Sequence, residues 1–402
     1  MNYWKSRWAG AAIAWLALTC IMTACGTSSA ANESLTSAMA EENGAVSGTA
    51  SDATGNKLSG DPAASSSGDS QSDSENSQTA AGSSDLTSAS RDIFAMDTYM
   101  TVKACGANAD QAVDDAENEI NRLDKLLSTG SDTSEVSDIN RNGGGSLSSD
   151  GQYLMKTSLA LYRSTNGLFD VSIYPVMELW GFPTKEYKVP DADELAATLK
   201  LVDASKIAYD ETTGKVSFAQ KGMEIDFGGI AKGYTSSRVM EIFRKDGVTS
   251  GLANLGGNVQ ALGTKPDGSN WRIAIRDPDD ESKYLGVLSI ADRAVITSGG
   301  YERYFKKDGK TYHHIIDPRT GYPAESGIKS ATVVSSDGTM ADGLSTSLFI
   351  MGVDTAEKYW RAHSDEFDMI LMDDDNQLYV TEEIADDFTG NYDVTVVKKG
   401  DS

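Results

Sequence analysis

The sequence changes character near residue 90, and this break limits how much of the chain can fold. Residues 26–90 consist mainly of Ser, Gly, Ala, Thr and Asp and contain no aromatic residue. A segment of this composition cannot bury enough apolar surface to offset the entropy lost on ordering, so we expect it to stay disordered. The fold must therefore be built from residues 91–402, which suffice for one large domain or two lobes.

Residues 1–25 have the layout of a bacterial export signal. A short basic region precedes a mostly apolar run that is short for a mature membrane span and ends in small residues before Cys25. The last four residues resemble a lipobox, in which the cysteine is lipidated and becomes the new N-terminus. Ordinary cleavage near Ala24 and an uncleaved anchor are the alternatives. Because a lipid anchor needs a tether, residues 26–90 favour a lipoprotein held at the extracytoplasmic face of the cell membrane.

The charge balance and the cysteines exclude several classes of protein. Lys and Arg total 35 against 60 Asp and Glu, which gives a net charge of −25. An acidic exported protein is a poor candidate for binding nucleic acid or anionic lipid. Two of the three cysteines lie in the export signal, so no disulfide framework is available within one chain, and no Cys/His metal spacing is present.

Strand and helix patterns alternate along the folded part without a strict βαβ repeat. Helical spacing is found at 108–127, 151–165, 191–200, 340–351 and 354–363, and a polar loop is expected at 128–145. Strand patterns occur at 94–106, 251–263, 271–277, 285–291, 293–305, 311–317, 329–335 and 369–380, and 223–247 should run from strand to helix. This pattern predicts an α+β fold with a largely antiparallel sheet core and helices packed on it.

The first candidate site is the sequence DFGGIAKG at 226–233. Gly228 and Gly229 separate the predicted strand from the predicted helix, so backbone N–H groups and the positive helix end could face an anion. Lys232 lies one turn into the helix and could reach a phosphate. The spacing matches neither a Walker A loop nor GxGxxG. A tight turn with a solvated lysine is the alternative, and spacing alone narrowly favours it.

The second candidate site is TMADGLSTS at 339–347. Asp342 and Thr346 are four residues apart and therefore share a face of the predicted helix. A carboxylate and a hydroxyl are oxygen ligands suited to Mg²⁺. The alternative is a capping box, with Thr339 as N-cap and Asp342 satisfying its amide. From these residues alone we favour the cap.

Three further segments carry weaker signals. Phe169 is most simply a core residue and Asp170 a turn residue. The run from Ser298 to Gly300 interrupts a strand, where a planar ligand could approach the backbone or a bulge could form. His313 and His314 are neighbours in a predicted strand, so they point to opposite faces and at most one can face a given site.

Taken together and in order, seven motifs resemble the FAD:protein FMN transferases, the ApbE family. They are MDTYMTV, TNGLFDVSIYPVMELWGF, IDFGGIAKGY, NLGGNVQALG, ITSGGYERYF, HIIDPRTGYP and ADGLSTSLFIMG, and the resemblance covers about 91–385. It implies the transfer of FMN from FAD to a threonine of a partner protein. The family is also commonly lipidated and exported.

The resemblance assigns roles to individual residues. The residues implied to contact FAD are Met96, Leu168, Phe169, Asp170, Asp226, Lys232, Ser298 and the neighbourhood of His313. The carbonyl of Gly229, with Asp342 and Thr346, is implied to hold Mg²⁺, which reverses our preference for the cap. In the loop after the first long helix, Gly130 stands where the family often has an aromatic residue, which leaves one stacking contact to the adenine or flavin unsupported.

The implied reaction fits these residues. Breaking a pyrophosphate needs charge neutralisation and in-line positioning, which Mg²⁺ and Lys232 would supply. The attacking threonine hydroxyl of the acceptor needs a base, and AMP would leave. We expect His314 to be that base, with Asp342 as the competitor.

Two other functions remain open from the sequence. One is a FAD pyrophosphatase that uses water in place of threonine, at the same site. The other is a non-enzymatic FAD-binding lipoprotein, which would have no need of Asp342 and Thr346. Acceptors of this family carry a short SGAT-like stretch, and the nearest run here, TSGLAN at 249–254, lacks the threonine. We therefore expect the acceptor to be a separate exported protein.

Overall fold

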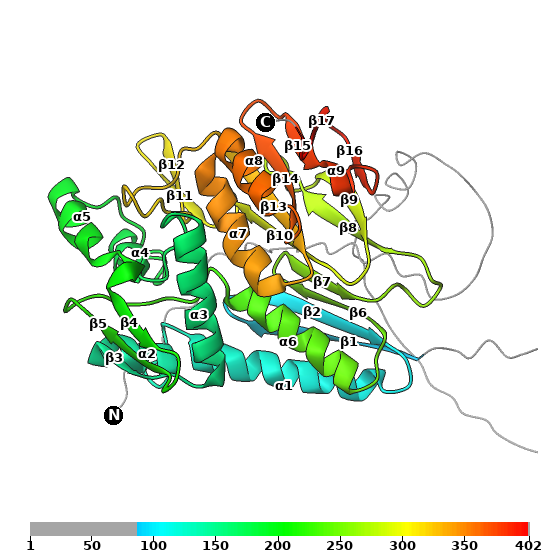
Figure 1. Cartoon of the computed structure of the whole chain (residues 1–402), viewed down its shortest axis with the longest axis horizontal. Coiled ribbons are helices and arrows are strands. Elements are labelled where there is room, and N and C mark those ends of the chain that lie inside the picture. Colours follow the sequence, from blue (N-terminus) through cyan, green and yellow to red (C-terminus); the bar gives the residue numbers. More distant parts are fainter. Residues whose placement is uncertain (1–86, 401–402) are drawn as a thin grey trace, which may run out of the picture. The chain divides into compact units, whose positions relative to one another are not determined.

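A nine-stranded sheet forms the centre of the computed structural model, which describes residues 87–400 (Figure 1). Its strands, in order across the sheet, are β1 (Ser88–Ala95), β2 (Thr98–Cys105), β6 (Ser250–Leu255), β7 (Asn258–Leu262), β10 (Ala294–Gly299), β13 (Ile328–Ser335), β14 (Asp368–Asp373), β15 (Leu378–Thr381) and β17 (Val394–Val397). Every neighbouring pair is antiparallel except β15 and β17, which are parallel. The predicted export signal, Cys25 and nearly all of the tether lie outside the described residues.

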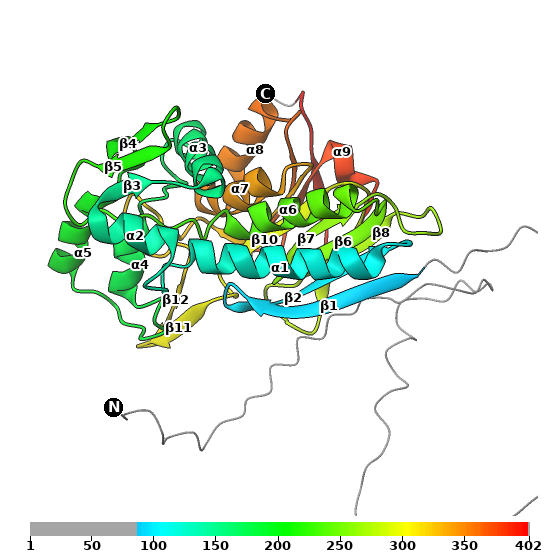
Figure 2. The same cartoon turned by 90° about the horizontal axis from the view of Figure 1, so that it is seen from below.

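Four helices cover one face of this sheet. They are α1 (Ala109–Leu127), α6 (Ala231–Lys245), α7 (Gly338–Met351) and α8 (Val353–Ala362). Figure 2 shows α1 lying along the β1–β2 side of the sheet, with α6 beside it. The apolar stripe of α1 is buried as predicted. Within residues 87–400, no helix combines the length and apolar character needed to cross a membrane.

Helix α7 is the most enclosed of the four. It packs on β10 and β13 and contacts α6, α8 and α3 (Ser149–Ser164). Of its fourteen residues only Met340, Thr346 and Met351 are partly exposed. A helix that is apolar nearly all round has to be buried on every side. Any polar side chain on α7 is therefore held in a desolvated, fixed position.

A second, three-stranded sheet covers the other face of the large one. It is formed by β8 (Trp271–Arg276), β9 (Tyr284–Ile290) and β16 (Phe388–Gly390), all antiparallel. Buried and exposed residues alternate strictly along β8, as expected for a strand with one face on a core. The apolar side chains of both sheets meet in one buried cluster.

The remaining elements form a lobe beside α7 and a separate hairpin. The lobe contains α3 with α2 (Glu135–Asn142), α4 (Tyr174–Trp180), α5 (Ala192–Thr198) and the antiparallel sheet β3 (Gly144–Ser146), β5 (Lys215–Phe218), β4 (Ile207–Asp210). The hairpin consists of β11 (Tyr304–Lys307) and β12 (Lys310–His313), and a short α9 (Glu382–Ala385) follows β15. This architecture confirms the predicted α+β class with a largely antiparallel sheet.

Three predicted elements were wrong. Residues 94–106 are not one strand, because Met96 and Asp97 have positive φ angles of 48° and 59° and reverse the chain between β1 and β2. The predicted loop at 128–145 contains α2, which begins where the Ser134 side chain accepts a hydrogen bond from Ser137 N. The predicted strand at 223–227 joins no sheet. Its backbone is held instead by Asn140, whose Oδ1 accepts from Ile225 N, and by the carbonyl of Val171.

Candidate functional site

The site is built where α6 and α7 cross at two glycines. A Cβ on Gly233 would lie 2.0 Å from the carbonyl oxygen of Gly338 and 2.7 Å from Cβ of Asp342. A Cβ on Gly338 would lie 2.7 Å from the carbonyl oxygen of Gly233. Only glycine allows two helix backbones to approach this closely. The close crossing brings Asp342 to the first turn of α6, where Gly233 N donates to its Oδ2 at 2.8 Å.

The capping box predicted for α7 was wrong. Asp337 is the N-cap, and its Oδ1 accepts from Thr339 N at 2.9 Å and from Met340 N at 3.2 Å. The cap therefore lies two residues before the predicted one. Because Asp337 already satisfies the start of α7, Asp342 is free to reach across to α6.

Carboxylates of the chain itself occupy the anion position predicted at the start of α6. The helix has no side-chain cap, and Asp342 accepts from Gly233 N while Asp226 Oδ1 accepts from Gly228 N at 2.8 Å. The positive end of the helix stabilises these negative charges. Burial raises the pKa of Asp342, and the nearby Lys232 ammonium and the Gly233 amide oppose that rise. Positive charge for an incoming phosphate therefore has to come from Lys232 rather than from these amides.

Lys232 points toward the turn between β6 and β7. Its Nζ lies 3.4 Å from Oδ1 of Asn258, the first residue of β7. The amide nitrogen of Asn258 is buried and faces the Asp342 carboxylate, where it opposes the rise in the pKa of that group. Asn258, which the sequence reasoning missed, therefore links the β6–β7 turn to both Lys232 and Asp342.

Thr346 lies one turn after Asp342 and is linked to β10. Ser298 Oγ is 2.8 Å from Ser345 Oγ and 3.2 Å from Thr346 Oγ1. The strand pattern at 293–305 is interrupted at the predicted glycines, although Ser298 itself is still in the strand: β10 ends at Gly299, and β11 begins at Tyr304. Ser298 turns its hydroxyl toward α7.

The oxygen atoms near the helix crossing can be compared with the ligands that a hard cation prefers. Among residues 87–400, no three His, Cys, Asp or Glu side chains gather closely enough to form a metal cluster. A metal here would need mixed oxygen donors: the Asp342 carboxylate, the Thr346 hydroxyl and a backbone carbonyl such as that of Gly229. Asp342 is only 5% exposed and Thr346 is half-buried on the same face of α7. This chemistry fits Mg²⁺, which prefers oxygen ligands and keeps several waters.

The segment Leu168–Phe169–Asp170 packs against the loop that precedes α6. Phe169 is buried, and a Cβ on Gly229 would lie 3.0 Å from its ring. Asp170 is a turn residue as predicted, because its Oδ1 accepts from Ser172 N at 2.8 Å and its Oδ2 from Ala204 N at 3.1 Å. These side chains are engaged inside the protein. Part of the backbone is engaged too, because Phe169 N donates to Thr165 Oγ1 at 3.1 Å, so the segment shapes the loop before α6 as a fixed support.

Met96 lies in the reverse turn between β1 and β2, next to the start of α6. Its backbone N donates to Asp124 Oδ1 at 2.9 Å, and its Sδ is 3.9 Å from the Thr235 hydroxyl. The structure therefore brings Met96 to the same helix start as Lys232, although 136 residues separate them in sequence.

The two histidines differ in their surroundings. β12 ends at His313, whose ring meets Phe349 of α7 edge-on with ring centres 5.5 Å apart. Its Nε2 lies 3.1 Å from the Ala324 carbonyl, and its Nδ1 accepts from Ile315 N at 3.3 Å. Both ring nitrogens of His313 are therefore used within the fold.

His314 keeps an unused ring nitrogen. Its backbone N donates to the carbonyl of Arg303 at 3.0 Å, while its Nδ1 is buried and has no hydrogen-bond partner within residues 87–400. Burial lowers the pKa of His314 to about 3, and the charges of Arg303, His313 and Lys232 add to this effect. The imidazole is therefore neutral at physiological pH. An anionic ligand would raise this pKa by offsetting those positive charges.

Glu302 is a second carboxylate that the sequence reasoning missed. Burial raises the pKa of Glu302, and the charges of Lys232 and Arg303 oppose that rise while Asp342 adds to it. Glu302 therefore shares the electrostatic field of the two helices. Its sequence signal was its place two residues after Gly300 in TSGGYER, where a Cβ on Gly300 would lie 2.9 Å from the His313 ring.

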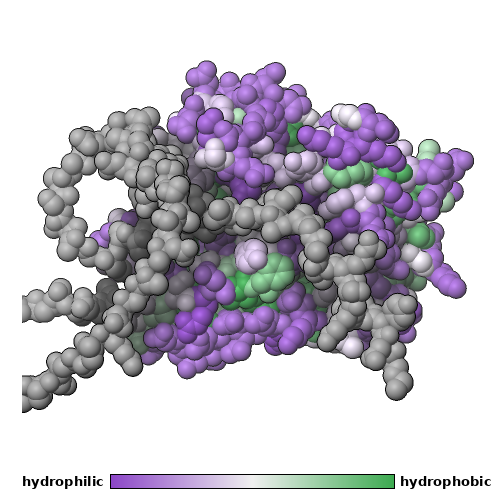
Figure 3. Space-filling view, turned by 180° about the vertical axis from the view of Figure 1, so that it is seen from behind, coloured by the Kyte–Doolittle hydropathy of each residue, from purple (hydrophilic) through white to green (hydrophobic). Residues whose placement is uncertain are grey.

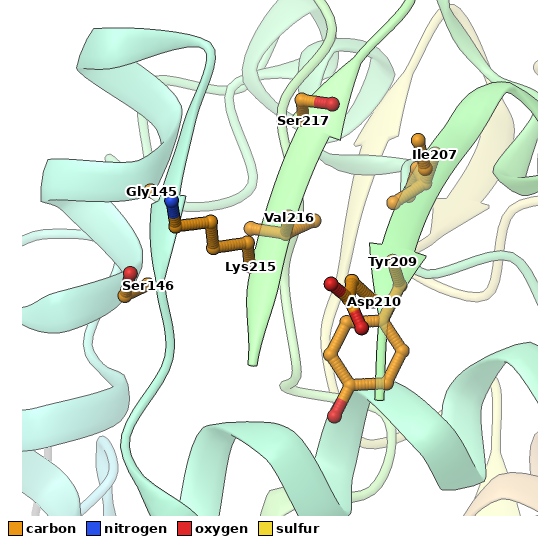
Figure 4. A pocket seen from close by; sticks show the side chains of 9 residues that line it. Gly145, Ser146, Ile207, Tyr209, Asp210, Lys215, Val216 and Ser217 are labelled. Atoms are coloured by element: carbon orange, nitrogen blue, oxygen red, sulfur yellow. The ribbon is translucent and has the colours of Figure 1, made fainter. Parts of the chain in front are cut away.

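A separate cavity of about 760 Å³ lies on the sheet β3–β5–β4 (Figure 4). Its lining includes Gly145, Ile207, Tyr209, Asp210 and Lys215. None of the predicted site residues lines this cavity. This open cavity therefore does not coincide with the crossing of α6 and α7.

The fold and the site together define an α+β domain with a lysine and a buried carboxylate at one helix crossing and a neutral histidine within reach of the lysine charge. The ApbE family model matches residues 96–371. A FAD:protein FMN transferase of Klebsiella pneumoniae is 39% identical over 239 residues, covering 58% of this chain and 74% of that protein. The same kind of protein from Haemophilus influenzae is 31% identical over 268 residues, covering 64% and 78%.

Solved structures of ApbE proteins share this fold. The ApbE protein of Thermotoga maritima superposes with a TM-score of 0.70 at 29% identity, covering 74% of this chain and 98% of that one. The flavinyl transferase ApbE of Pseudomonas stutzeri gives 0.64 at 28% identity, covering 72% and 92%. The chain therefore belongs to the ApbE family. This confirms the resemblance inferred from the seven motifs, and the matched span contains every predicted flavin and metal residue.

Proposed function

We propose that the protein transfers FMN from FAD to a threonine hydroxyl of an exported acceptor protein in a Mg²⁺-dependent reaction that releases AMP. The relatives from Klebsiella pneumoniae and Haemophilus influenzae are FAD:protein FMN transferases, which supports the class of activity. The observation that carries the proposal is the position of Asp342, a buried carboxylate held against the start of α6 beside Lys232.

In the proposed reaction, the threonine oxygen forms a bond to the phosphorus of the FMN half of FAD. The bond from that phosphorus to the bridging oxygen breaks, and AMP leaves with this oxygen. The threonine proton passes to a base. Lys232 would lie against the pyrophosphate, where its positive charge offsets the negative charge that develops on the leaving group.

Asp342, Thr346 and the carbonyl of Gly229 would hold Mg²⁺, which when bound supplies charge neutralisation at the pyrophosphate. Their oxygen chemistry and the burial of Asp342 support this assignment. The residues proposed to contact FAD are Met96, Leu168, Phe169, Asp170, Asp226, Lys232, Ser298 and the position of His313. The packing of Met96, Phe169 and Lys232 around the start of α6 supports this grouping.

His314 is the proposed base. Its imidazole is neutral at physiological pH and the residue is only half-buried, which supports a role in accepting the threonine proton. Asp342 is the competitor, but one of its oxygens already accepts from Gly233 N, which suits a ligand better than a base. A pKa of about 3 makes His314 a weak base in the absence of substrate, so the phosphates of FAD would have to raise it.

The proposed location follows from the N-terminal sequence. Residues 1–25 would direct export, Cys25 would carry the lipid, and residues 26–90 would tether the catalytic domain, residues 91–402, to the membrane. The acceptor would then be a protein exposed at the same face of the membrane.

The test is to mix the protein with FAD, Mg²⁺ and a threonine-bearing acceptor and to look for flavin fluorescence on the acceptor in a denaturing gel. Asp342→Ala serves as the matched inactive control. A fluorescent acceptor band with the wild-type protein alone supports the proposal. Release of FMN without label on any acceptor would instead identify a FAD pyrophosphatase.

A further inference from the structure

We propose that the hairpin β11–β12 is the docking surface for the acceptor protein, and that it binds an acidic, extended segment beside the reacting threonine. This inference rests on the proposed transfer to a protein acceptor. It adds a docking surface on this protein and an acidic character of the acceptor segment, neither of which follows from the transfer reaction alone.

The hairpin carries a local charge opposite to that of the chain. Residues 303–310, RYFKKDGK, contain four basic residues and one acid, whereas the whole chain has a net charge of −25. Lys306 and Lys307 are exposed and form no ion pair among residues 87–400, while Lys310 pairs with Glu325 at 2.6 Å. Charges farther apart than about 8 Å are largely screened at physiological salt. An acidic segment would therefore respond to this local patch rather than to the net charge.

The backbone of the hairpin is open to a third strand. β11 and β12 pair only with each other among the described strands, in the register from Tyr304 opposite His313 to Lys307 opposite Lys310. Their outer edges can therefore bond an extended chain, a common way to bind peptides. Edge lysines normally deter unwanted strands, so pairing here selects an acidic one.

Aromatic packing holds the hairpin in place. Phe305 stacks on Tyr312 with ring centres 5.3 Å apart and on Tyr187 at 5.2 Å, and Trp180 lies 5.4 Å from Tyr312. Trp180 is itself fixed by a hydrogen bond from its Nε1 to the Gly321 carbonyl. A surface fixed in this way loses less entropy when a partner binds.

The hairpin also leads directly to the proposed base. The Arg303 carbonyl, just before β11, accepts from the backbone N of His314, just after β12. A segment paired with the hairpin would therefore run toward His314. In Figure 2 the hairpin lies at the lower edge of the molecule, on the same side as β1 and β2 and next to α4. In the view from behind (Figure 3), hydrophilic side chains make up most of the visible described surface, with a hydrophobic patch near the centre.

The test compares two fluorescein-labelled peptides that share one threonine, flanked by four Asp in one and by four Asn in the other. Binding is measured by anisotropy on the full protein, independently of any transfer. We expect the Asp peptide to bind about tenfold more tightly than the Asn peptide, with the difference shrinking as salt is added. In Lys306→Glu/Lys307→Glu this preference should disappear, and in the matched control Lys215→Glu/Lys221→Glu, on exposed lysines of the lobe, it should remain.

Equal binding of both peptides to the wild-type protein, or the same loss in both double variants, would overturn the docking proposal. FAD binding is measured on the same samples by flavin fluorescence. A weakened affinity for FAD in the hairpin variant would assign these lysines to the cofactor site and also overturn it. Failure of the proposed function has a different signature, because no peptide or protein would then acquire covalent flavin even where the Asp peptide binds.

Discussion

The cavity on the sheet β3–β5–β4 and the crossing of α6 and α7 offer a ligand very different surroundings. The cavity has volume, but Asp210 and Lys215, its charged lining residues, are exposed to solvent. The crossing buries Asp342 beside Lys232, and the charge of Lys232 also acts on the half-buried His314, whose pKa it helps to lower. Electrostatic interactions are much stronger away from water. We therefore expect the reaction at the charged groups of the helix crossing rather than at the open cavity.

Asp342→Asn should give the largest effect on transfer. The amide oxygen can still accept from Gly233 N, so the fold should be kept, but the negative charge is lost. We expect single-turnover flavin transfer to fall by about a thousandfold, comparable to the loss of a charged group at a phosphoryl-transfer site. Thermal unfolding of the variant provides the control for folding. A transfer rate within tenfold of wild type would show that the crossing is not the reaction centre.

His314→Ala should keep FAD binding and slow transfer by about a hundredfold, because loss of a general base costs about this much. FAD affinity from flavin fluorescence and labelling rate from gel fluorescence separate the two effects. His313→Ala, at the neighbouring position, is the control variant. It should lower the free energy of unfolding instead, since both ring nitrogens of His313 form hydrogen bonds within the fold. Unchanged labelling by His314→Ala would remove it as the base.

Gly233→Ala tests the crossing as a structural device. The added Cβ would meet the Gly338 carbonyl at 2.0 Å, so the two helices must separate. We expect a loss of roughly 1–3 kcal/mol in the free energy of unfolding, measured by urea denaturation, together with slower transfer. Gly143→Ala, at a position where a Cβ meets nothing within 4 Å but φ is +67°, provides a control for backbone strain alone. Equal stability of Gly233→Ala and wild type would mean that the helices do not cross this closely.

Stability should fall with acid partly through His314. Its folded pKa of about 3 lies below its ordinary value of 6.5. Between these values the unfolded chain binds a proton at this position and the folded chain does not, so stability decreases as pH falls from about 6.5 toward 3. In His314→Gln the pH dependence of the free energy of unfolding should be shallower by about one proton in this range. An unchanged slope would show that the ring is protonated in the fold.

The smallest effect should come from the cavity. Lys215→Ala and Tyr209→Phe alter its lining without touching the helix crossing. We expect transfer rates within about twofold of wild type, since surface substitutions away from special features are usually close to neutral. A tenfold loss of transfer in either variant would show that the cavity, rather than the helix crossing alone, is part of the reaction site.

Sequence patterns predicted the parts of the fold that depend on local periodicity. The buried stripe of α1 and the two strands around Gly256 and Gly257 follow directly from spacing. The seven motifs also located Asp342, Lys232 and the histidines. Spacing could not show that Gly233 and Gly338 touch, that Asp337 rather than Thr339 caps α7, or that Met96 turns the chain. Those features depend on contacts between segments far apart in sequence, and so does the low pKa of His314.

The most direct test of the account is the stoichiometry of one transfer reaction. Wild-type protein, FAD, Mg²⁺ and an acceptor are incubated, AMP is measured by chromatography, and the flavin attached to threonine is measured by mass spectrometry of the denatured acceptor. We predict one bound FMN for each AMP released, with both lost in Asp342→Asn. Release of AMP together with free FMN, and no flavin on threonine, would contradict a transferase and leave a hydrolase in its place.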